Sequence, residues 1–332
     1  MSTPILPTCF MRVLDSMLEN PYFRYNARFA REIFENSFKE HPTEVSAHVK
    51  LDNVNTYRLN SSGYRSDEFE PGAELVVAGC SFTFGSGVPE AWRWGAVVAK
   101  ELGLKETNLG VCAWSTQLII ENIFAYVKKY GAPKKLLCLF PDPSRSPLSA
   151  VEGFLEYDDG FDGDRQVVNV MLERMTDYEY SDKPKYSRRP YQIDDVIPIE
   201  LPMYFYFKYI QMLEEYCAVS GIELLWSTWD RQLGEYLEDR SDGQAKHLMH
   251  GFRNYVELRC VDWEWDISVE GGGMIASMLE DSKRAYGDCH PDLEKQFGDN
   301  FYMGTDVEGL VHWGVHKHVH IAERFVEAIS AR

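Results

Sequence analysis

A short apolar run that ends in a glycine-bounded turn constrains this chain most. The run Leu75–Ala78 has the length and the β-branching of a buried strand in a parallel sheet. Gly79 and Gly85 bound the turn that follows, and Ser81 lies inside it. A helical pattern over residues 89–103 comes next, with a proline at its start. The sequence therefore predicts a strand, a tight turn and a helix, with Ser81 at the carboxyl edge of an α/β sheet, where open sheets bind their ligands.

The alternation of apolar strands and amphipathic helices continues along the chain. Alternation of this kind is typical of a parallel sheet with helices on both faces. We therefore expect an α/β fold, a three-layer α/β/α sandwich with a mainly parallel central sheet. The apolar spacing predicts strand 74–80, helix 89–103, strand 107–111, helix 115–130, strand 134–140, helix 202–219, strand 222–226 and a closing helix over about 316–330.

Two long segments interrupt this rhythm, at about residues 143–200 and 240–300. They are interpreted as insertions on the sheet scaffold, where they would shape access to a site at the sheet edge. Residues 1–50 are amphipathic, with helical spacing. The sequence thus predicts an N-terminal helical cap and lead-in over 1–72, followed by one α/β domain over 73–332 that contains both insertions.

The charge of the chain excludes some classes of partner. Its 332 residues carry a formal net charge of −18 at pH 7. A chain this acidic is unsuited to non-specific binding of nucleic acid or of an anionic membrane surface. No apolar run reaches the length of a transmembrane helix, and the first residues do not have the pattern of a signal peptide. We expect a cytoplasmic protein that binds neither nucleic acid nor membrane.

The cysteines and histidines give no metal site. The seven cysteines are scattered and never form a Cys-x-x-Cys pair, which suits reduced thiols. His316 and His320 are one helical turn apart, a spacing that could hold zinc, but the sequence fixes no further ligand. We interpret them as a pair on the surface of the closing helix, and we expect no metal and no other cofactor.

The glycine-bounded turn admits three interpretations. A phosphate-binding loop is disfavoured, because the glycines at 79, 85 and 87 fit neither the Walker pattern nor the dinucleotide fingerprint. A structural loop rich in serine and threonine stays open. In the third interpretation Ser81 is a nucleophile, which needs a base, an orienting group and donors for an oxyanion. The best candidate for the base is His312, on the loop before the closing helix.

At this point the chain resembles the SGNH, or GDSL-like, hydrolase superfamily. The resemblance covers about residues 55–142 and 202–330. It implies the α/β/α fold expected above and a serine hydrolase that acts on carboxylic esters. Four segments carry the resemblance. Asn60–Ser66 is similar to the lead-in of the family, and Gly79–Gly85 is similar to its first block. Asn108–Ser115 is similar to the second block, and His312–Ala322 to the last.

The resemblance assigns roles to particular residues. It implies Ser81 as the nucleophile and His312 as the base that takes the proton of Ser81. The backbone N–H groups of Ser81 and Ala113 would hold the oxyanion. Two positions depart from the family pattern: Cys80 stands where the family usually has Asp, and Ala113 stands where the second block has glycine.

Two further departures leave alternatives open. The third block of the family usually supplies an asparagine that donates to the oxyanion, and this chain has none directly after the predicted strand 134–140. Ser144 or Arg145 is a candidate substitute for that donor, with Asp142 as an auxiliary residue. The acid that precedes the catalytic histidine is replaced by glycine at position 309. Three ways to orient His312 remain, namely Asp306, Glu308 or a carbonyl group. His290, which precedes a proline, is the second candidate for the base.

Two functions from different classes follow. The first is an SGNH-type serine esterase or deacetylase, for example one that acts on acylated carbohydrate, with a small-molecule or carbohydrate ester as its partner. The second is a non-catalytic protein on the same scaffold, structural or glycan-binding, such as a component of a phage particle. In that case the N-terminal helices would serve homo-oligomer or viral assembly, and the protein would be virion-associated.

Overall fold

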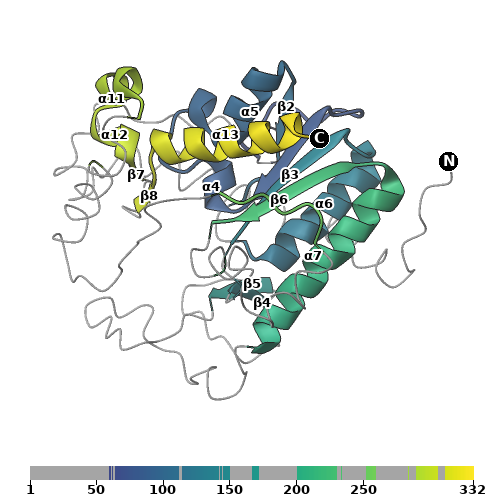
Figure 1. The fold of residues 1–332 in the computed structure, drawn as a ribbon. Helices are drawn as coiled ribbons and strands as arrows, with labels where there is room; N and C mark the ends of the chain where they lie inside the picture. Colours follow the sequence, from purple (N-terminus) through teal and green to yellow (C-terminus); the bar gives the residue numbers. More distant parts are fainter. Residues whose placement is uncertain are drawn as a thin grey trace, which may run out of the picture.

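The computed structural model describes residues 60, 62, 64–111, 114–141, 143, 145–149, 167–171, 200–229, 233, 252–258, 283, 289–305 and 311–332. Within these residues a four-stranded parallel sheet forms the centre (Figure 1). Its strands are β1 (Leu75–Gly79), β2 (Glu106–Asn108), β3 (Lys135–Phe140) and β6 (Glu223–Thr228). All four were predicted from the sequence, and the expected α/β class is confirmed.

The strand order is β2-β1-β3-β6, so the four strands, counted along the chain, lie in the order 2-1-3-4. This is the order of flavodoxin-like folds, in which the direction of the chain reverses next to the first strand. The chain moves from β1 to β2 in one direction and then crosses back over β1 to reach β3. Ligands of such sheets bind outside the carboxyl ends of the strands at this switch point. Ser81, which follows β1, lies at that place.

The same topology distributes the helices over two faces of the sheet. Right-handed crossovers place α5 (Trp94–Leu102) and α6 (Thr116–Tyr130) on opposite faces, because their two connections run in opposite directions. α7 (Glu200–Ser220) packs beside α6, and α13 (Val315–Ser330) packs beside α5. Figure 1 shows these two helix layers above and below the strands. The expected three-layer sandwich is therefore the observed architecture.

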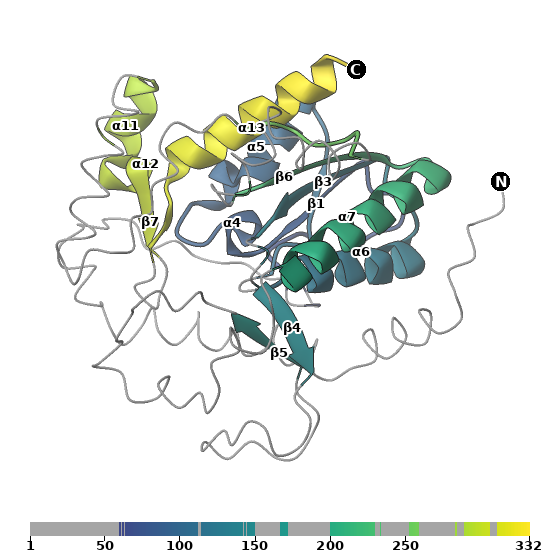
Figure 2. The ribbon, with the colours of Figure 1, turned by 60° about the horizontal axis from the view of Figure 1, so that its bottom comes forward.

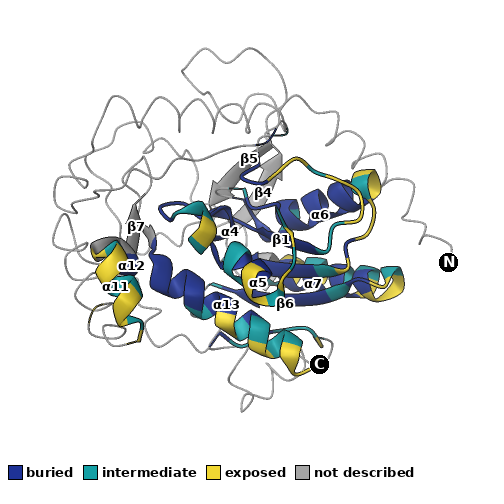
Figure 3. Ribbon diagram, turned by 90° about the horizontal axis from the view of Figure 1, so that it is seen from above, coloured by how far each residue is buried: buried dark blue, intermediate teal, exposed yellow. Residues whose placement is uncertain are grey.

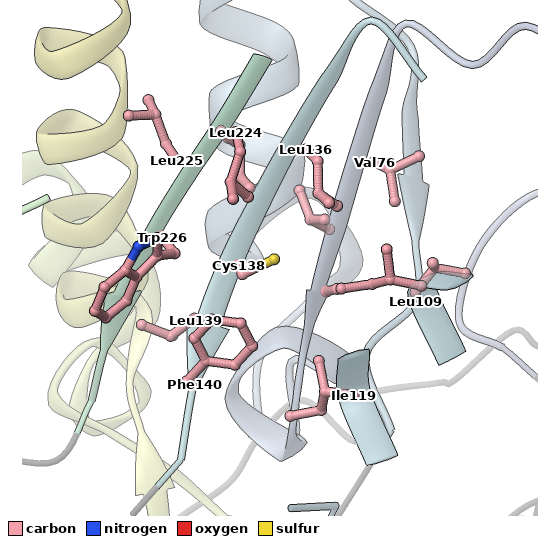
Figure 4. Packing of buried hydrophobic residues seen from close by; sticks show 14 of the residues in the cluster. Val76, Leu109, Ile119, Leu136, Cys138, Leu139, Phe140, Leu224, Leu225 and Trp226 are labelled. Atoms are coloured by element: carbon pink, nitrogen blue, oxygen red, sulfur yellow. The ribbon is translucent and has the colours of Figure 1, made fainter. Parts of the chain in front are cut away.

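The core lies where the strands bury consecutive apolar residues. All five residues of β1 are buried, as expected for a strand covered on both faces. Leu136 of β3 is in register with Val76 on one side and with Leu224 on the other, and Figure 4 shows these side chains in a row. On the α5 face, the rings of Trp94 and Phe325 are stacked, with centroids 5.1 Å apart.

The helix expected over 89–103 is interrupted, and this part of the prediction is wrong. A 3₁₀ turn, η1 (Glu90–Trp92), precedes α5, and the two are separated by Arg93, whose backbone is extended (φ −62°, ψ 140°). The Arg93 guanidinium donates to both carboxylate oxygens of Glu106, at 2.9 and 3.0 Å. This bidentate pair holds the Arg93 side chain on β2 at the point where the helix is interrupted.

Smaller elements surround the sheet. α11 (Pro291–Phe297), α12 (Asp299–Tyr302), β7 (Met303–Thr305) and β8 (Val311–Trp313) lie near the start of α13 (Figure 2). A separate antiparallel pair is formed by β4 (Arg145–Ser149) and β5 (Val167–Met171) within the first predicted insertion.

Figure 3 shows that α13 is buried over its first turns and becomes exposed toward its C-terminal end. No described helix is long and apolar enough to cross a membrane.

The predicted division into a cap over 1–72 and a domain over 73–332 stays a prediction. The residues before Asn60 lie outside the described part, as do most residues of both predicted insertions.

Candidate functional site

Ser81 is the first residue of a single helical turn, α4 (Ser81–Phe84), that follows β1 directly. Its carbonyl accepts the N–H groups of Gly85 and Ser86, at 2.8 and 3.0 Å. The first N–H groups of a helix have no acceptor within the helix, so the N–H of Ser81 is suited to bind an external oxygen. The side chain is 7% exposed, and its Oγ lies 4.0 Å from Sγ of Cys80. The predicted strand-to-turn placement of Ser81 is thus observed.

The turn packs so closely that two of its neighbours have to be glycine. A Cβ atom at Gly79 would lie 2.0 Å from Oγ1 of Thr83 and 2.6 Å from the carbonyl oxygen of Leu139. A Cβ atom at Gly110 would lie 2.3 Å from the backbone nitrogen of Phe84. Separations this short are well inside van der Waals contact. The backbone after β2 therefore lies directly against α4.

Asn108, the first residue of the segment that resembles the second block, holds these two backbones together. Its amide Nδ2 donates to the carbonyl of Thr83 at 3.1 Å, and its Oδ1 accepts the N–H of Gly110 at 2.8 Å. At the end of the same segment, Ser115 caps α6 by accepting the N–H of Leu118. Asn108 and Ser115 are therefore structural, and Ala113 between them lies outside the described residues.

Arg65, from the segment that resembles the lead-in, satisfies the carbonyl groups at the end of α4. Its guanidinium donates to the carbonyls of Phe84, Gly85 and Val88, at 3.3, 2.6 and 2.9 Å. The side chain is completely buried. The last carbonyl groups of a helix have no donor within it, and a cation stabilises this end.

Asn60 and Tyr64 shape the lead-in itself. Oδ1 of Asn60 accepts the N–H groups of Ser62 and Tyr64, both at 3.0 Å, which closes a tight turn. The Tyr64 hydroxyl donates to Oδ1 of Asn122 on α6 at 2.8 Å. Burial raises the pKa of Tyr64 well above its ordinary value. The lead-in thus anchors Arg65 on the sheet domain.

Three aromatic rings, those of Phe82, Trp229 and Trp313, pack together beside the turn that carries Ser81. The Phe82 ring lies 4.2 Å from that of Trp313 and 5.0 Å from that of Trp229, measured between centroids. Trp229 follows β6, so its position at the carboxyl edge could have been inferred from the sequence. Its indole N–H also donates to Sγ of Cys80 at 3.1 Å. Trp229 therefore contacts both residues that flank Ser81.

The contact between Phe82 and Trp313 brings His312 into the region of Ser81. His312 lies in β8 and pairs with Gly304 of β7, so the loop predicted there is a short strand. Phe82 follows Ser81 in sequence, and Trp313 follows His312. The ring contact consequently places the two chain segments in the same region, while the His312 side chain lies outside the described atoms.

The other predicted site residues divide into two groups. Asp142, Ser144, Asp306, Glu308 and Gly309 lie outside the described residues, and of Arg145 only the backbone, in β4, is described. His290 precedes α11, with Nε2 3.8 Å from the Glu323 carboxylate of α13 and its ring 6.4 Å from that of Phe301. Among the described contacts, none joins His290 to the Ser81 turn.

The histidines of α13 are structural, and their interpretation as a surface pair is wrong. His316 is buried, and its Nδ1 lies 2.7 Å from the carbonyl oxygen of Phe301. His320 is half-buried, with Nε2 2.6 Å from the carbonyl oxygen of Leu258. His318 is fully buried and accepts the N–H of Trp94 at Nδ1, at 3.1 Å. No cluster of three metal-ligating side chains occurs within the described residues.

Comparison with known proteins gives distant matches of fold. No protein-family model and no curated protein matches the sequence. One solved structure that overlaps is described as a lipolytic protein of the G-D-S-L family from Desulfitobacterium hafniense DCB-2. It is 11% identical, with a TM-score of 0.38 over 76% of this chain and 97% of that one.

Two more solved structures overlap at the same distance. A carbohydrate esterase family 2 enzyme with a carbohydrate binding domain, from Corynascus thermopiles (Myceliophthora fergusii), is 12% identical, with a TM-score of 0.34 over 80% of this chain and 67% of that one. A protein described as a platelet activating factor, from Streptococcus pneumonia, is 13% identical, with a TM-score of 0.32 over 91% and 99%. The strand order of the sheet, rather than these overlaps, establishes the fold class.

Proposed function

We propose that this chain is a serine hydrolase of the SGNH type that cleaves carboxylic esters, with Ser81 as the nucleophile and His312 as the base. One observation carries the proposal. The ring of Phe82 packs on the ring of Trp313, at 4.2 Å, at the switch point of the sheet. This contact joins the segment of the candidate nucleophile to the segment of the candidate base, 231 positions further along the chain (from Phe82 to Trp313).

The chemistry would run in two halves. In the first, Oγ of Ser81 bonds to the ester carbonyl carbon while His312 takes the hydroxyl proton. The tetrahedral intermediate carries its negative charge on the former carbonyl oxygen. The N–H of Ser81 at the start of α4 would donate to it, together with the N–H of Ala113 as the second expected donor. The carbon–oxygen bond to the alcohol then breaks, and the alcohol leaves with the proton from His312.

The second half releases the acyl group. Water attacks the acyl-enzyme and gives one proton to His312. The bond to Oγ then breaks, and Ser81 recovers its proton from His312, which frees the carboxylic acid. Asp306, Glu308 or a carbonyl group would orient His312 in both halves. Asp142 and Arg145, which follow β3 in the sequence, are proposed as auxiliary residues.

We also propose a small-molecule or carbohydrate ester as the substrate. The G-D-S-L protein and the carbohydrate esterase named above support this class only as distant likenesses of fold.

An activated fluorophosphonate tests the nucleophile directly. We expect it to label the wild-type protein on Ser81, to leave Ser81→Ala unlabelled, and to label His312→Ala much more slowly. Ser86→Ala is the matched control, because Ser86 is a buried serine of the same turn, and this variant should label normally. His290→Ala should also label normally. Labelling that persists in Ser81→Ala would refute the proposal.

One observation favours the second candidate, a non-catalytic scaffold. Ser81 is 7% exposed, and the closest described partner of its Oγ is the sulfur of Cys80. A structural or glycan-binding protein, such as a component of a phage particle, needs no accessible serine. In that case the wild-type protein would stay unlabelled and would turn over no aryl ester, although it is fully folded.

A further inference from the structure

The helix α13 contacts the Ser81 turn through a chain of two hydrogen bonds, which starts at His318. His318 is completely buried on α13. Its Nδ1 accepts the N–H of Trp94, the first residue of α5, at 3.1 Å. The first N–H groups of α5 have no acceptor within their helix, so this histidine serves as a cap from a distant part of the chain. Because Nδ1 accepts, the neutral ring carries its proton on Nε2.

Trp94 continues the connection from α13 to α4. Its indole N–H donates to Oγ1 of Thr83 at 3.3 Å, two residues after Ser81. Thr83 is 1% exposed, and its hydroxyl lies over Gly79, where even a Cβ atom would not fit. The ring of Trp94 is held in turn by stacking on Phe325 of α13. The backbone and the side chain of Trp94 are therefore both fixed by α13.

The candidate base precedes the N-terminus of the same helix, six positions before His318. His312 lies in β8, and only Trp313 and Gly314 separate it from Val315, the first residue of α13. One rigid element thus places the backbone of His312 and, through Trp94 and Thr83, also the turn that carries Ser81. A displacement of about 1 Å between reacting groups can lower a rate about 100-fold.

We infer that His318 is a positioning residue, which sets the distance between the Ser81 turn and the His312 segment by fixing Trp94. The inference rests on the proposed function for its catalytic consequence, but its structural part stands alone. His318 touches neither Ser81 nor a substrate in this scheme. Its contribution depends on an acceptor at the position of Nδ1, and not on the charge or the bulk of the ring.

Three variants separate this role from general stability. His318→Asn keeps an acceptor near the position of Nδ1, and His318→Leu removes it. His316→Leu is the matched control, because His316 is equally buried on the same helix but contacts the carbonyl of Phe301. We expect His318→Leu to lower kcat for an aryl ester by about 10- to 100-fold with little change in KM. His318→Asn and His316→Leu should stay within a few-fold of the wild type.

Amide hydrogen exchange tests the structural part without any catalysis. The N–H groups of Gly85 and Ser86 bond to the carbonyl of Ser81, so their protection reports whether the turn is intact. Protection should fall in His318→Leu, and it should be kept in His318→Asn and His316→Leu. The wild type could show normal protection of these amides and still hydrolyse no ester and react with no fluorophosphonate. That result would refute the proposed function and leave the positioning role unaffected.

A second site on the same connection covers the case in which His318→Leu does not fold. Thr83→Val keeps the shape of the side chain and removes the acceptor for the indole of Trp94, so it should show the same loss of kcat and of protection. The positioning role would be overturned if His316→Leu and His318→Leu had equal effects on kcat and protection. It would also be overturned if His318→Asn behaved like His318→Leu.

Discussion

Trp229 donates its indole N–H to the sulfur of Cys80 at 3.1 Å, which joins the end of β6 to the residue before Ser81. The ring of the same tryptophan packs on Phe82, after Ser81. One side chain therefore holds both neighbours of the candidate nucleophile. The sulfur of Cys80 is thus a buried acceptor.

Trp229→Phe should remove the first contact and weaken the second, because phenylalanine has a smaller ring and no donor. The free energy of unfolding should fall by at least about 1 kcal/mol, the usual net value of a hydrogen bond, since packing is lost as well. A double-mutant cycle with Cys80→Ala, followed by urea unfolding, measures the coupling. If the two effects simply add, the hydrogen bond contributes nothing to stability.

Arg93→Met should be among the most destabilising single changes in the described sheet domain. It would leave Glu106 buried without its partner, and breaking a buried pair typically costs about 3–5 kcal/mol. Burial raises the pKa of Glu106, while Arg93 lowers it, so loss of Arg93 raises it further. A carboxyl group with a raised pKa in the folded state favours folding when it is protonated. The penalty at pH 7 should therefore shrink as the pH falls toward 4.

Urea unfolding at several pH values checks this expectation, with Arg93→Met/Glu106→Gln as the control. The double variant has no buried carboxylate at this place. It should be more stable than Arg93→Met at pH 7, and its difference from that variant should vanish in acid. A penalty independent of pH would contradict the role of the unpaired carboxylate.

His320 should make the protein less stable in mild acid. Burial lowers the pKa of His320, and the nearby Lys317 and Arg324 act in the same direction, against the Leu258 carbonyl and Glu323. A histidine with a lowered pKa in the folded state contributes stability above the unfolded value of about 6.5. This contribution is lost as the pH falls from there through the folded value, because the unfolded chain takes up the proton first.

The comparison of wild type with His320→Gln isolates that contribution, since a glutamine amide can still donate to the carbonyl of Leu258. Between pH 7.5 and 5.5 the wild type should lose more of its unfolding free energy than the variant does. Equal losses in the two proteins would show that His320 does not titrate in this window.

Gly110→Ala and Gly221→Ala should differ sharply, although each adds one methyl group. At Gly110 the methyl group would meet the backbone of α4, which cannot move without the Ser81 turn. At Gly221 it would meet open space, and only the positive φ of 70° is unfavourable, worth about 1 kcal/mol. Thermal unfolding should show a loss of a few degrees for Gly221→Ala and a much larger one for Gly110→Ala. Similar losses would contradict the close contact.

The strands and most helices could be predicted because their pattern is local. β1, β3 and β6 are continuous apolar runs, and α6 and α13 have regular apolar spacing, so burial on the sheet follows directly from the sequence. The interruption at Arg93 could not be predicted in this way. The partner of the Arg93 side chain is Glu106, which is adjacent to it only in the folded structure.

The position of the candidate site could be predicted from the sequence, but the contacts that hold it in place could not. Ser81 follows a buried strand, so its place at the sheet edge can be inferred from the local pattern. The roles of His316 and His320 depend on carbonyl groups at Phe301 and Leu258, which belong to distant segments without a recognisable pattern. The role of Trp94 likewise depends on contacts with two other helices.

The bond between His318 and Trp94 also has a consequence for synthesis of the chain. The two residues are 224 positions apart, and ribosomes add roughly 5–20 residues per second. Trp94 and the Ser81 turn therefore leave the ribosome roughly 10–50 s before the helix that fixes them. During this interval the nascent strands can pair, but the turn has no support from α13. Any function that depends on the Ser81 turn would therefore be absent on the ribosome until α13 emerges.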